Sequence, residues 1–220
     1  MSSRPRATDP AALARAAAAI GVDADAGTCR RLAAYLDAML DENTRINLTA
    51  IRDTEAALWL HAVDALGLAL AIPEGAARVF DLGTGNGFPG VAAAALWPKA
   101  RTVLCDRTRK KVDAVSRCVA RAGLGAKAAW LDADQIRSQH PELCGAFDVV
   151  TARAVADPVA VARSAHPLLA PGGRLVLWLT AEDHPPVMLA GNLRKESRHT
   201  YTLEVDPPRE RAIAVWRLEA

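Results

Sequence analysis

Apolar residues in the first third of the chain recur at the three- and four-residue spacing of amphipathic helices. Asp9 and Pro10 open an Ala-rich helix, as its N-cap and its first helical residue, and Gly21 ends it. A second helix is predicted over about 28–45, with its leucines on one face, and a third over about 53–72. The chain therefore begins with a helical segment.

After this segment, short apolar runs alternate with helical stretches. Strands are predicted at 78–82, 101–106, 126–131, 147–152 and 173–180, helices near 87–97, 108–122, 157–169 and 182–194, and a final antiparallel pair at 199–205 and 211–218. Strand–helix alternation predicts an α/β fold with a mainly parallel sheet that helices cover on both faces. We therefore predict an N-terminal helical segment over 1–75 and an α/β nucleotide-type domain over 76–220.

Composition narrows the class of protein. Hydrophobic residues make up 51% of the 220 residues and the formal net charge is +2, which excludes a mainly disordered or a polybasic chain. The longest apolar stretch, around 66–72, is far shorter than the roughly 18 residues of a membrane-spanning helix, so no membrane partner is expected. No apolar run follows the N-terminus, and the four cysteines form no Cys-x-x-Cys pair. We therefore expect reduced thiols and a cytoplasmic location.

The most informative segment is a strand that runs directly into glycines. The apolar run 79–82 leads into Gly83, Gly85, Gly87 and Gly90. Glycines allow a sharp turn and bring bare backbone against a ligand, and the helix that follows offers free N–H groups. In a parallel sheet such a ligand lies beyond the carboxyl ends of the strands. We therefore expect a nucleotide-type cofactor at this loop.

Two cofactor classes fit such a loop. Residues 85–90 match the Gly-x-Gly-x-x-Gly dinucleotide fingerprint, with Asp106 at a suitable distance. However, Asp81 at the end of the strand would repel a pyrophosphate. An acidic residue followed by a Gly-x-Gly-x-Gly loop resembles motif I of the seven-strand S-adenosylmethionine (SAM) methyltransferases. Because SAM carries cationic groups and no phosphate, SAM is the expected cofactor, and an NAD-linked oxidoreductase is the alternative.

Acidic residues also follow the next two predicted strands. Asp106 ends the second strand, where a carboxylate can accept hydrogen bonds from a ribose diol. The third strand leads into Asp132-Ala133-Asp134, the turn that meets the adenine in SAM enzymes. For both turns the alternative interpretation is an ordinary helix N-cap.

Further motifs match a narrower family. They are Asn47-Leu48-Thr49 with Arg52, His61-x-x-Asp64, Asp81-x-Gly-Thr-Gly-x-Gly-Phe-Pro-Gly and Ala152-Arg153-Ala154. With these motifs the chain resembles the RsmG (GidB) family over about 28–218, nearly its whole length. The resemblance implies a methyltransferase that modifies N7 of a guanine in bacterial 16S rRNA, with 16S rRNA or the small ribosomal subunit as its partner.

The resemblance also implies which residues form the site. The implied cofactor-binding residues are Asp81, Gly83, Gly85, Gly87, Phe88, Asp106, Ala133, Asp134 and Arg153. Of these, Asp106 would hold the ribose and Ala133 and Asp134 would meet the adenine. Arg153 would lie at the cofactor or substrate end.

The chain departs from the family at several polar positions. Leu179 and Thr180 stand where the family usually has Lys-Gly, Ala212 stands where it often has histidine, and Ala65 replaces a serine. Leucine cannot bind what a lysine binds. These changes motivate an alternative, a divergent relative that methylates a small heterocycle or another RNA, with Trp178 lining an altered pocket. A non-catalytic SAM- or RNA-binding protein is a further alternative.

Methyl transfer to guanine N7 needs proximity and alignment but no general base, because N7 carries a free lone pair. The candidates for a catalytic role are Arg153 and Asp64, each with a structural role as the alternative. The five histidines show no metal-ligand spacing, so no metal is expected. The basic cluster over 107–111 is either a phosphate-contacting patch or a solvated helix face.

Overall fold

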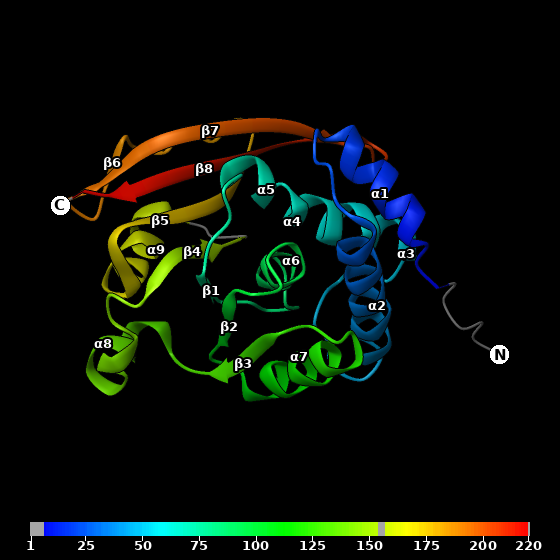
Figure 1. The fold of residues 1–220 in the computed structure, drawn as a ribbon, viewed down its shortest axis with the longest axis horizontal. Helices are drawn as coiled ribbons and strands as arrows, with labels where there is room; N and C mark the ends of the chain where they lie inside the picture. Colours follow the sequence, from blue (N-terminus) through cyan, green and yellow to red (C-terminus); the bar gives the residue numbers. More distant parts are fainter. Residues whose placement is uncertain (1–6, 154–156, 220) are drawn as a thin grey trace.

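A mostly parallel β-sheet forms the centre of the α/β part of the protein (Figure 1). The structure, a computed structural model, describes residues 7–153 and 157–219. The sheet has the order β3-β2-β1-β4-β5-β8-β7-β6, and its strands are β1 (Arg78–Leu82), β2 (Arg101–Asp106), β3 (Ala126–Trp130), β4 (Phe147–Ala152), β5 (Leu169–Thr180), β6 (Met188–Leu189), β7 (Leu193–Leu203) and β8 (Arg209–Leu218). Strands β1 to β5 pair in parallel, and β8 joins β5 antiparallel. The predicted α/β class is confirmed, with the two-residue β6 added to seven longer strands.

Helices cover both faces of the sheet. They are α1 (Pro10–Ala19), α2 (Ala26–Glu42), α3 (Thr54–Ala57), α4 (Asp64–Leu66), α5 (Leu68–Ala71), α6 (Gly90–Leu96), α7 (Arg109–Arg121), α8 (Ile136–Gln139) and α9 (Pro158–Ala165). A π-helical turn, Leu58–Val63, joins α3 to α4, and 3-10 turns occupy Ala133–Gln135, Pro141–Leu143 and His166–Leu168.

The core consists of two apolar clusters, one on each face of the sheet. Successive residues of a strand point to opposite faces, so Val79 joins the cluster under the N-terminal helices, α6 and α7, while Phe80 joins the cluster under α8 and α9. The first cluster is continuous from α1 to β8, because Leu13, Val79 and Val215 all belong to it. The N-terminal helices therefore share one core with the sheet.

Aspartates begin the N-terminal helices, as the sequence predicts. Asp9 accepts a hydrogen bond from the Ala11 amide at 2.9 Å, and Asp53 accepts one from the Ala56 amide at 2.8 Å. The predicted second helix begins slightly earlier, because Asp25 caps it and accepts from the Thr28 amide at 2.9 Å. Each cap satisfies an amide that the helix itself leaves without a partner.

One predicted helix is wrong. Residues 182–194 form no helix; the chain there contains a turn, an extended stretch, β6 and the first residues of β7. Pro185 and Pro186 lack the amide hydrogens that a helix needs, and the backbone of Val187 instead accepts a hydrogen bond from the Lys195 amide at 2.7 Å. As a result β7 begins at Leu193, before the predicted 199–205 strand.

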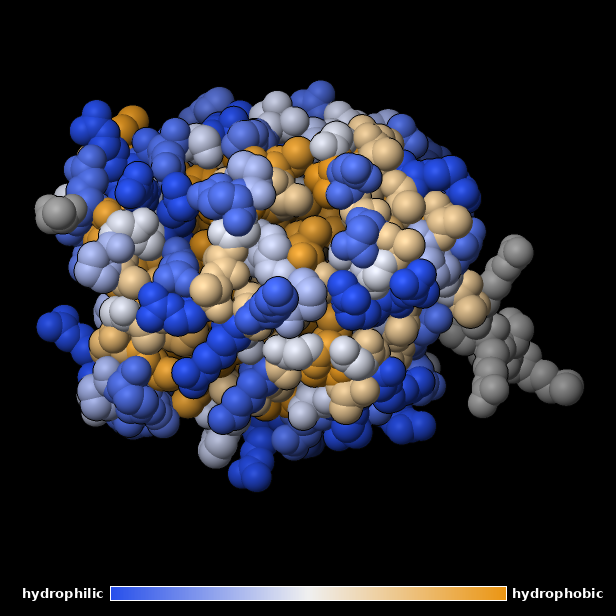
Figure 2. All heavy atoms as spheres, viewed as in Figure 1, coloured by the Kyte–Doolittle hydropathy of each residue, from blue (hydrophilic) through white to orange (hydrophobic). Residues whose placement is uncertain are grey.

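The helical run Thr54–Ala71 has the length and the mean hydropathy, 1.2, of a membrane-spanning helix, and 56% of it is buried inside the protein. The window includes Glu55 and Asp64, so it is not an uninterrupted apolar run. Such burial is typical of a core helix. On the face of the protein shown in Figure 2, hydrophilic side chains cover much of the surface and apolar atoms are visible between them.

Helix α2 is tied to α7 by an ion pair with one buried partner. The Glu42 side chain is 4% exposed and accepts hydrogen bonds from Arg117 at 2.7 and 3.1 Å. The guanidinium of Arg117 holds the pKa of Glu42 below its usual value. One turn further along α7, Arg121 lies 2.7 Å from Asp41, whose side chain is 49% exposed.

We expect Arg117→Ala to lower the free energy of unfolding by about 2 kcal/mol, because it removes both hydrogen bonds to a buried carboxylate and leaves it only Arg45, at 3.9 Å. Arg121→Ala is the matched control, since it removes an arginine at the same 2.7 Å distance from an exposed carboxylate, and we expect it to cost less than about 1 kcal/mol. Urea denaturation of the two variants measures the difference. Equal losses of unfolding free energy in the two variants would show that the burial of Glu42 does not strengthen its ion pair.

Candidate active site

A pocket of about 370 Å³ opens at the carboxyl ends of β1, β2 and β3. Its lining residues are Leu82, Gly83, Cys105, Asp106, Arg107, Thr108, Lys111, Leu131, Asp132, Ala133, Asp134 and Ser164. The sequence predicted Gly83, Asp106, Ala133 and Asp134 as cofactor residues from three separate turns, and the fold brings all four into this pocket. Its volume suits a nucleoside-sized ligand.

The glycine loop has the backbone that only glycine adopts easily. Gly83, Gly85 and Gly87 have φ values of 69°, 56° and 98°. A Cβ at Gly83 would meet nothing within 4 Å, so the pocket approaches bare backbone there. A Cβ at Gly87 would lie 1.9 Å from the hydroxyl oxygen of Tyr35, so this glycine is needed for packing. Gly87 therefore supports the loop and does not line the pocket.

Asp106 lies at the pocket with both carboxylate oxygens engaged by backbone. One oxygen accepts from the Thr108 amide at 2.7 Å and the other from the Gly85 amide at 3.0 Å. The first contact is a turn that precedes α7 and not an N-cap, since Thr108 is the N-cap residue of α7 and its side chain makes no capping hydrogen bond. Each carboxylate oxygen has two lone pairs, so Asp106 retains acceptor capacity for ligand hydroxyls.

The turn after β3 is also ordered by its own carboxylates. Asp132 accepts a hydrogen bond from the Asp134 amide at 3.2 Å, as the N-cap interpretation expected. Asp134 in turn accepts from the hydroxyl of Ser164 on α9 at 2.8 Å. Ser164 is not among the predicted site residues, because its contact joins residues 30 positions apart and no local motif marks it.

Asp81 lies beneath the loop and outside the pocket lining. The residue is fully buried; one carboxylate oxygen accepts from the Thr151 hydroxyl at 2.6 Å. Burial raises the pKa of Asp81 to about 6. Contacts of the carboxylate with the Thr151 and Thr84 hydroxyls and with the Gly90 amide partly offset this rise in pKa. The contacts to Thr84 and Gly90 tie Asp81 to the glycine loop above it.

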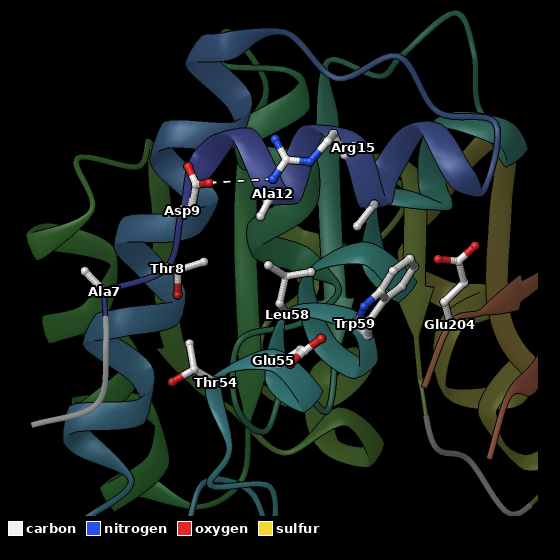
Figure 3. A pocket seen from close by; sticks show the side chains of 11 residues that line it. Ala7, Thr8, Asp9, Ala12, Arg15, Thr54, Glu55, Leu58, Trp59 and Glu204 are labelled. Atoms are coloured by element: carbon white, nitrogen blue, oxygen red, sulfur yellow. Dashed lines mark ion pairs between the residues drawn. The ribbon is translucent and has the colours of Figure 1, made fainter. Parts of the chain in front are cut away.

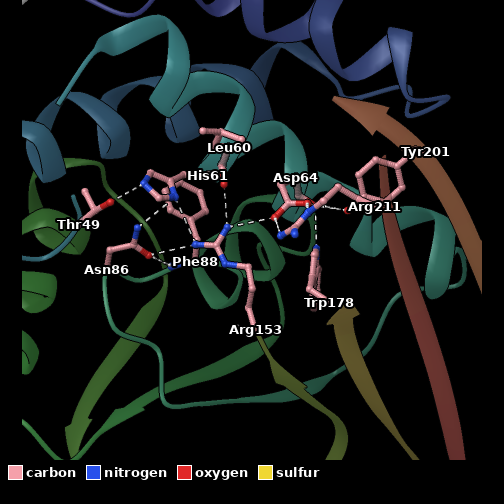
Figure 4. A network of polar contacts seen from close by, with 10 residues as sticks. All are labelled: Thr49, Leu60, His61, Asp64, Asn86, Phe88, Arg153, Trp178, Tyr201 and Arg211. Carbon is pink, nitrogen blue, oxygen red and sulfur yellow. Dashed lines mark hydrogen bonds and ion pairs between the residues drawn. The ribbon is translucent and has the colours of Figure 1, made fainter. Parts of the chain in front are cut away.

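A polar network continues from the loop to the N-terminal helices (Figure 4). Arg153, just after β4, donates to the Leu60 carbonyl at 3.0 Å and to Asp64 at 3.3 Å. It also contacts His61 and the side-chain oxygen of Asn86, both at 3.3 Å. The predicted Arg153 thus lies beside the loop with its guanidinium engaged by protein groups. Ala154, the last residue of the same motif, lies outside the described residues.

Asp64 is the centre of this network. Its side chain is 0% exposed and forms ion pairs with Arg153 at 3.3 Å and Arg211 at 3.1 Å. The Tyr201 hydroxyl donates to its carboxylate at 2.8 Å, and the Trp178 indole donates to its backbone carbonyl at 2.8 Å. A carboxylate so enclosed cannot touch a substrate base. These contacts therefore favour a structural role for Asp64 over a catalytic one.

His61 is held neutral between polar partners. Burial and, to a smaller extent, the nearby Arg153 charge lower its pKa to about 3. Its Nδ1 faces the nitrogens of Asn86 and Arg153, which are donors, so Nδ1 is the acceptor. Nε2 then carries the hydrogen and donates to the Thr49 hydroxyl at 2.9 Å. The ring of His61 also stacks on Phe88, with centroids 6.0 Å apart.

Three further predicted residues lie in the core. Phe88 is 2% exposed and packs between His61 and Tyr35, outside the pocket lining. Trp178 is 2% exposed and its indole donates to Asp64, so the expectation that it lines an altered substrate pocket is wrong. Leu179 is 5% exposed and belongs to the apolar cluster under α9.

A second hollow, of about 520 Å³, lies between α1, α3 and the end of β7 (Figure 3). Trp59 and Leu58 form its apolar part, and its charged lining residues are Asp9, Arg15, Glu55 and Glu204. We call it the acidic hollow. It contains none of the predicted site residues.

Known proteins similar to this chain show which family it belongs to. A model of the GidB family, described as rRNA small subunit methyltransferase G, matches residues 28–185. The chain belongs to this family. It is 35% identical to the ribosomal RNA small subunit methyltransferase G of Sorangium cellulosum, over 77% of this chain and 72% of that protein. The corresponding protein of Lacticaseibacillus paracasei is 33% identical, over 90% of this chain and 87% of its own length. The resemblance inferred from the motifs is confirmed.

Solved structures agree on the fold of this GidB family member. The O-methyltransferase TomG from Streptomyces achromogenes, solved in complex with SAM, aligns with a TM-score of 0.57 and 18% identity over 84% of this chain and 90% of that chain. A putative O-methyltransferase from Klebsiella pneumoniae aligns over the same shares with a TM-score of 0.57 and 16% identity. These structures show the α/β methyltransferase fold, and membership of the GidB family makes the chain a SAM-dependent methyltransferase.

We expect Gly87→Ala to lower the free energy of unfolding by about 3 kcal/mol, because its Cβ would overlap Tyr35 and its φ is positive. Gly123→Ala is the control. Gly123 also has a positive φ, 63°, but a Cβ there would meet nothing within 4 Å, so only backbone strain of about 1 kcal/mol applies. Urea denaturation tests both, and a loss in Gly87→Ala no larger than in Gly123→Ala would contradict the packing argument.

The pKa of His61 gives a pH dependence with a defined sign. Its folded value of about 3 lies below the ordinary 6.5, so the unfolded chain binds the proton first. The stability that neutral His61 contributes is complete above pH 6.5 and falls as the pH is lowered toward 3. Between pH 6.5 and 4.5 the loss from this residue amounts to about 2 kcal/mol.

His61→Asn keeps polar contacts but cannot take up a proton, so its unfolding free energy should fall less than that of the wild type over this range. Urea denaturation of both proteins at each pH from 4.5 to 7.5 measures the difference in their unfolding free energies. The contributions of the other titrating groups are the same in both proteins and cancel in this difference. Parallel pH profiles for the two proteins would refute the assignment of a depressed pKa to His61.

Proposed function

We propose that this protein transfers the methyl group of SAM to N7 of a guanine in the 16S rRNA of the small ribosomal subunit. The observation that carries the proposal is the pocket at the ends of β1 to β3, which collects Gly83, Asp106, Ala133 and Asp134 in a chain of this family. The relatives that match the chain are named ribosomal RNA small subunit methyltransferase G.

In this proposal the pocket holds the cofactor through three contacts. Asp106 accepts hydrogen bonds from the ribose hydroxyls with the lone pairs that Gly85 and Thr108 leave free. The Ala133 amide and the Asp134 carboxylate meet the adenine edge. Gly83 lets the aminoacyl end lie against bare backbone. Asp81 acts through the loop, since it is fully buried beneath it.

The main task of the protein in this reaction is to place the methyl group and guanine N7. When bound, SAM supplies a methyl group on a cationic sulfur, and the C–S electron pair returns to sulfur as the guanine N7 lone pair forms the new bond. The protein has no proton to remove from N7. Its task is to hold the two atoms in line at about 3–3.5 Å and to exclude water from them.

Arg153 and Asp64 are positioning residues in this proposal. Asp64 fixes the guanidinium of Arg153, and Arg153 in turn contacts Asn86 in the glycine loop. This chain of contacts sets the loop relative to the end of β4. In this proposal residues 76–220 bind the cofactor, and residues 1–75 support the glycine loop through the contacts of His61 with Asn86 and Phe88. A reduced, cytoplasmic setting agrees with a ribosomal substrate.

The decisive experiment supplies radiolabelled SAM to the purified protein with small ribosomal subunits that lack the N7-methylguanine. We expect label in 16S rRNA at a single guanine. A panel of purines and other heterocycles runs in parallel, because the loss of the family lysine at Leu179 motivated that alternative. Label in a heterocycle and none in rRNA would overturn the proposal, and binding of SAM without any transfer would favour a non-catalytic role.

We expect Asp106→Ala to raise the dissociation constant for SAM about 10- to 100-fold, since it removes a charged acceptor from the ribose. Asp106→Asn should show a smaller loss, because its amide oxygen still accepts one hydrogen bond. Asp113→Ala is the control, an exposed aspartate on α7 outside the pocket lining. Calorimetric titration measures all three, and unchanged binding in Asp106→Ala would place the ribose elsewhere.

A further inference from the structure

Trp130 is an exposed aromatic side chain in a fixed position. It ends β3, the edge strand of the sheet, and is 57% exposed. Its indole N–H donates to the Arg107 carbonyl at 2.9 Å, and the guanidinium of Arg109 lies over its ring, 5.2 Å from the centroid. An indole that is held in place yet remains in water is ready to stack on a planar ligand.

The groove beside Trp130 adjoins the cofactor pocket without being part of it. It has a volume of about 540 Å³, and Gln135, Gln139 and His140 face it together with Trp130. We call it the tryptophan groove. Arg107, Leu131 and Asp132 line both this groove and the cofactor pocket, whereas Trp130 lines only the groove. A ligand in the groove therefore lies next to the cofactor, at the edge of the sheet.

Basic residues at the start of α7 adjoin the tryptophan groove: Arg107 lines it and Arg109 lies over the Trp130 ring, while Asp132 also lines it. Arg107, Arg109 and Lys110 are exposed and Lys111 is half-buried. Within residues 7–153 and 157–219, no acidic side chain lies within ion-pair distance of these four cations. Cations without acidic partners, beside an exposed aromatic ring, match the two components of single-stranded RNA: phosphates and bases.

The opposite sign of charge appears elsewhere on the molecule. The acidic hollow beside α1 has Asp9, Glu55 and Glu204 against Arg15. A polyanion is repelled by such a lining and attracted to the edge formed by β3 and α7. The distribution of charge therefore favours an approach of RNA from the β3 edge.

We propose that the tryptophan groove binds an unpaired nucleotide of the rRNA substrate other than the methylated guanine. Its base stacks on Trp130, its edge meets the amides of Gln135 and Gln139, and the neighbouring phosphates contact Arg107, Lys110 and Lys111. This inference rests on the proposed function and deepens it by assigning an RNA contact outside the cofactor pocket.

The test compares Trp130→Ala with Trp130→Phe in methylation of small ribosomal subunits. We expect Trp130→Ala to raise the KM for subunits about 5- to 100-fold, the range that one base–aromatic stack supplies. Trp130→Phe, which keeps an aromatic face, should restore most of the loss. The dissociation constant for SAM, measured by calorimetry, should change less than the KM for subunits in both variants.

Charge variants test the phosphate contacts separately. Lys110→Ala should weaken binding of subunits and lower the slope of log KM against log salt by about 1. The control is Arg15→Ala, which removes an exposed arginine beside the acidic hollow; it should leave the slope as in the wild type. An equal change of slope in both variants would show a general charge effect and overturn the phosphate assignment.

The outcomes separate this inference from the proposed function. A wild-type protein that puts no label into rRNA refutes the function itself. Labelling by the wild type with an unchanged KM for subunits in Trp130→Ala overturns the inference alone. A rise in the SAM dissociation constant with no change in KM for subunits would also overturn it, because Trp130 would then cover the cofactor.

Discussion

The arrangement of the molecule depends on one buried carboxylate. Asp64 lies in the N-terminal helical run and its side chain is 0% exposed, a position in which an unpaired charge costs several kcal/mol. Arg153 after β4 and Arg211 on β8 supply the opposite charges, and Tyr201 on β7 donates a hydrogen bond. The helical run can therefore occupy one position only, against the carboxyl end of β4 and the antiparallel strands.

The same network extends to the cofactor loop. Arg153 contacts Asn86 and His61, and His61 stacks on Phe88 of the loop. His61 belongs to the π-helical turn Leu58–Val63. Because a π-helical turn rotates the residues that follow it relative to an α-helix, it changes which way they face; such turns often occur at functional sites. The loop is thus supported from below by Asp81 and from one side by the helical run.

Charge divides the surface into functional regions. Carboxylates predominate in the hollow beside α1, whereas Arg107 lines the groove beside Trp130 and, with Lys111, faces Asp106, Asp132 and Asp134 in the cofactor pocket. The net charge of +2 conceals this separation, since the two signs nearly cancel over the chain. A protein of modest net charge can therefore still present a local surface suited to a polyanion.

Local patterns in the sequence determined the helix starts, the parallel strands and the turns that meet at the pocket. N-cap residues, short apolar runs and glycines each specify the backbone over only a few residues, so they can be recognised without the fold. They failed at 182–194, where two prolines and a long β7 prevent the predicted helix. Only the tertiary structure decided the partners of Asp64, the burial of Trp178 and the exposure of Trp130. These depend on contacts between residues far apart in the chain, such as Asp64 and Arg211, 147 residues apart, which no local spacing encodes.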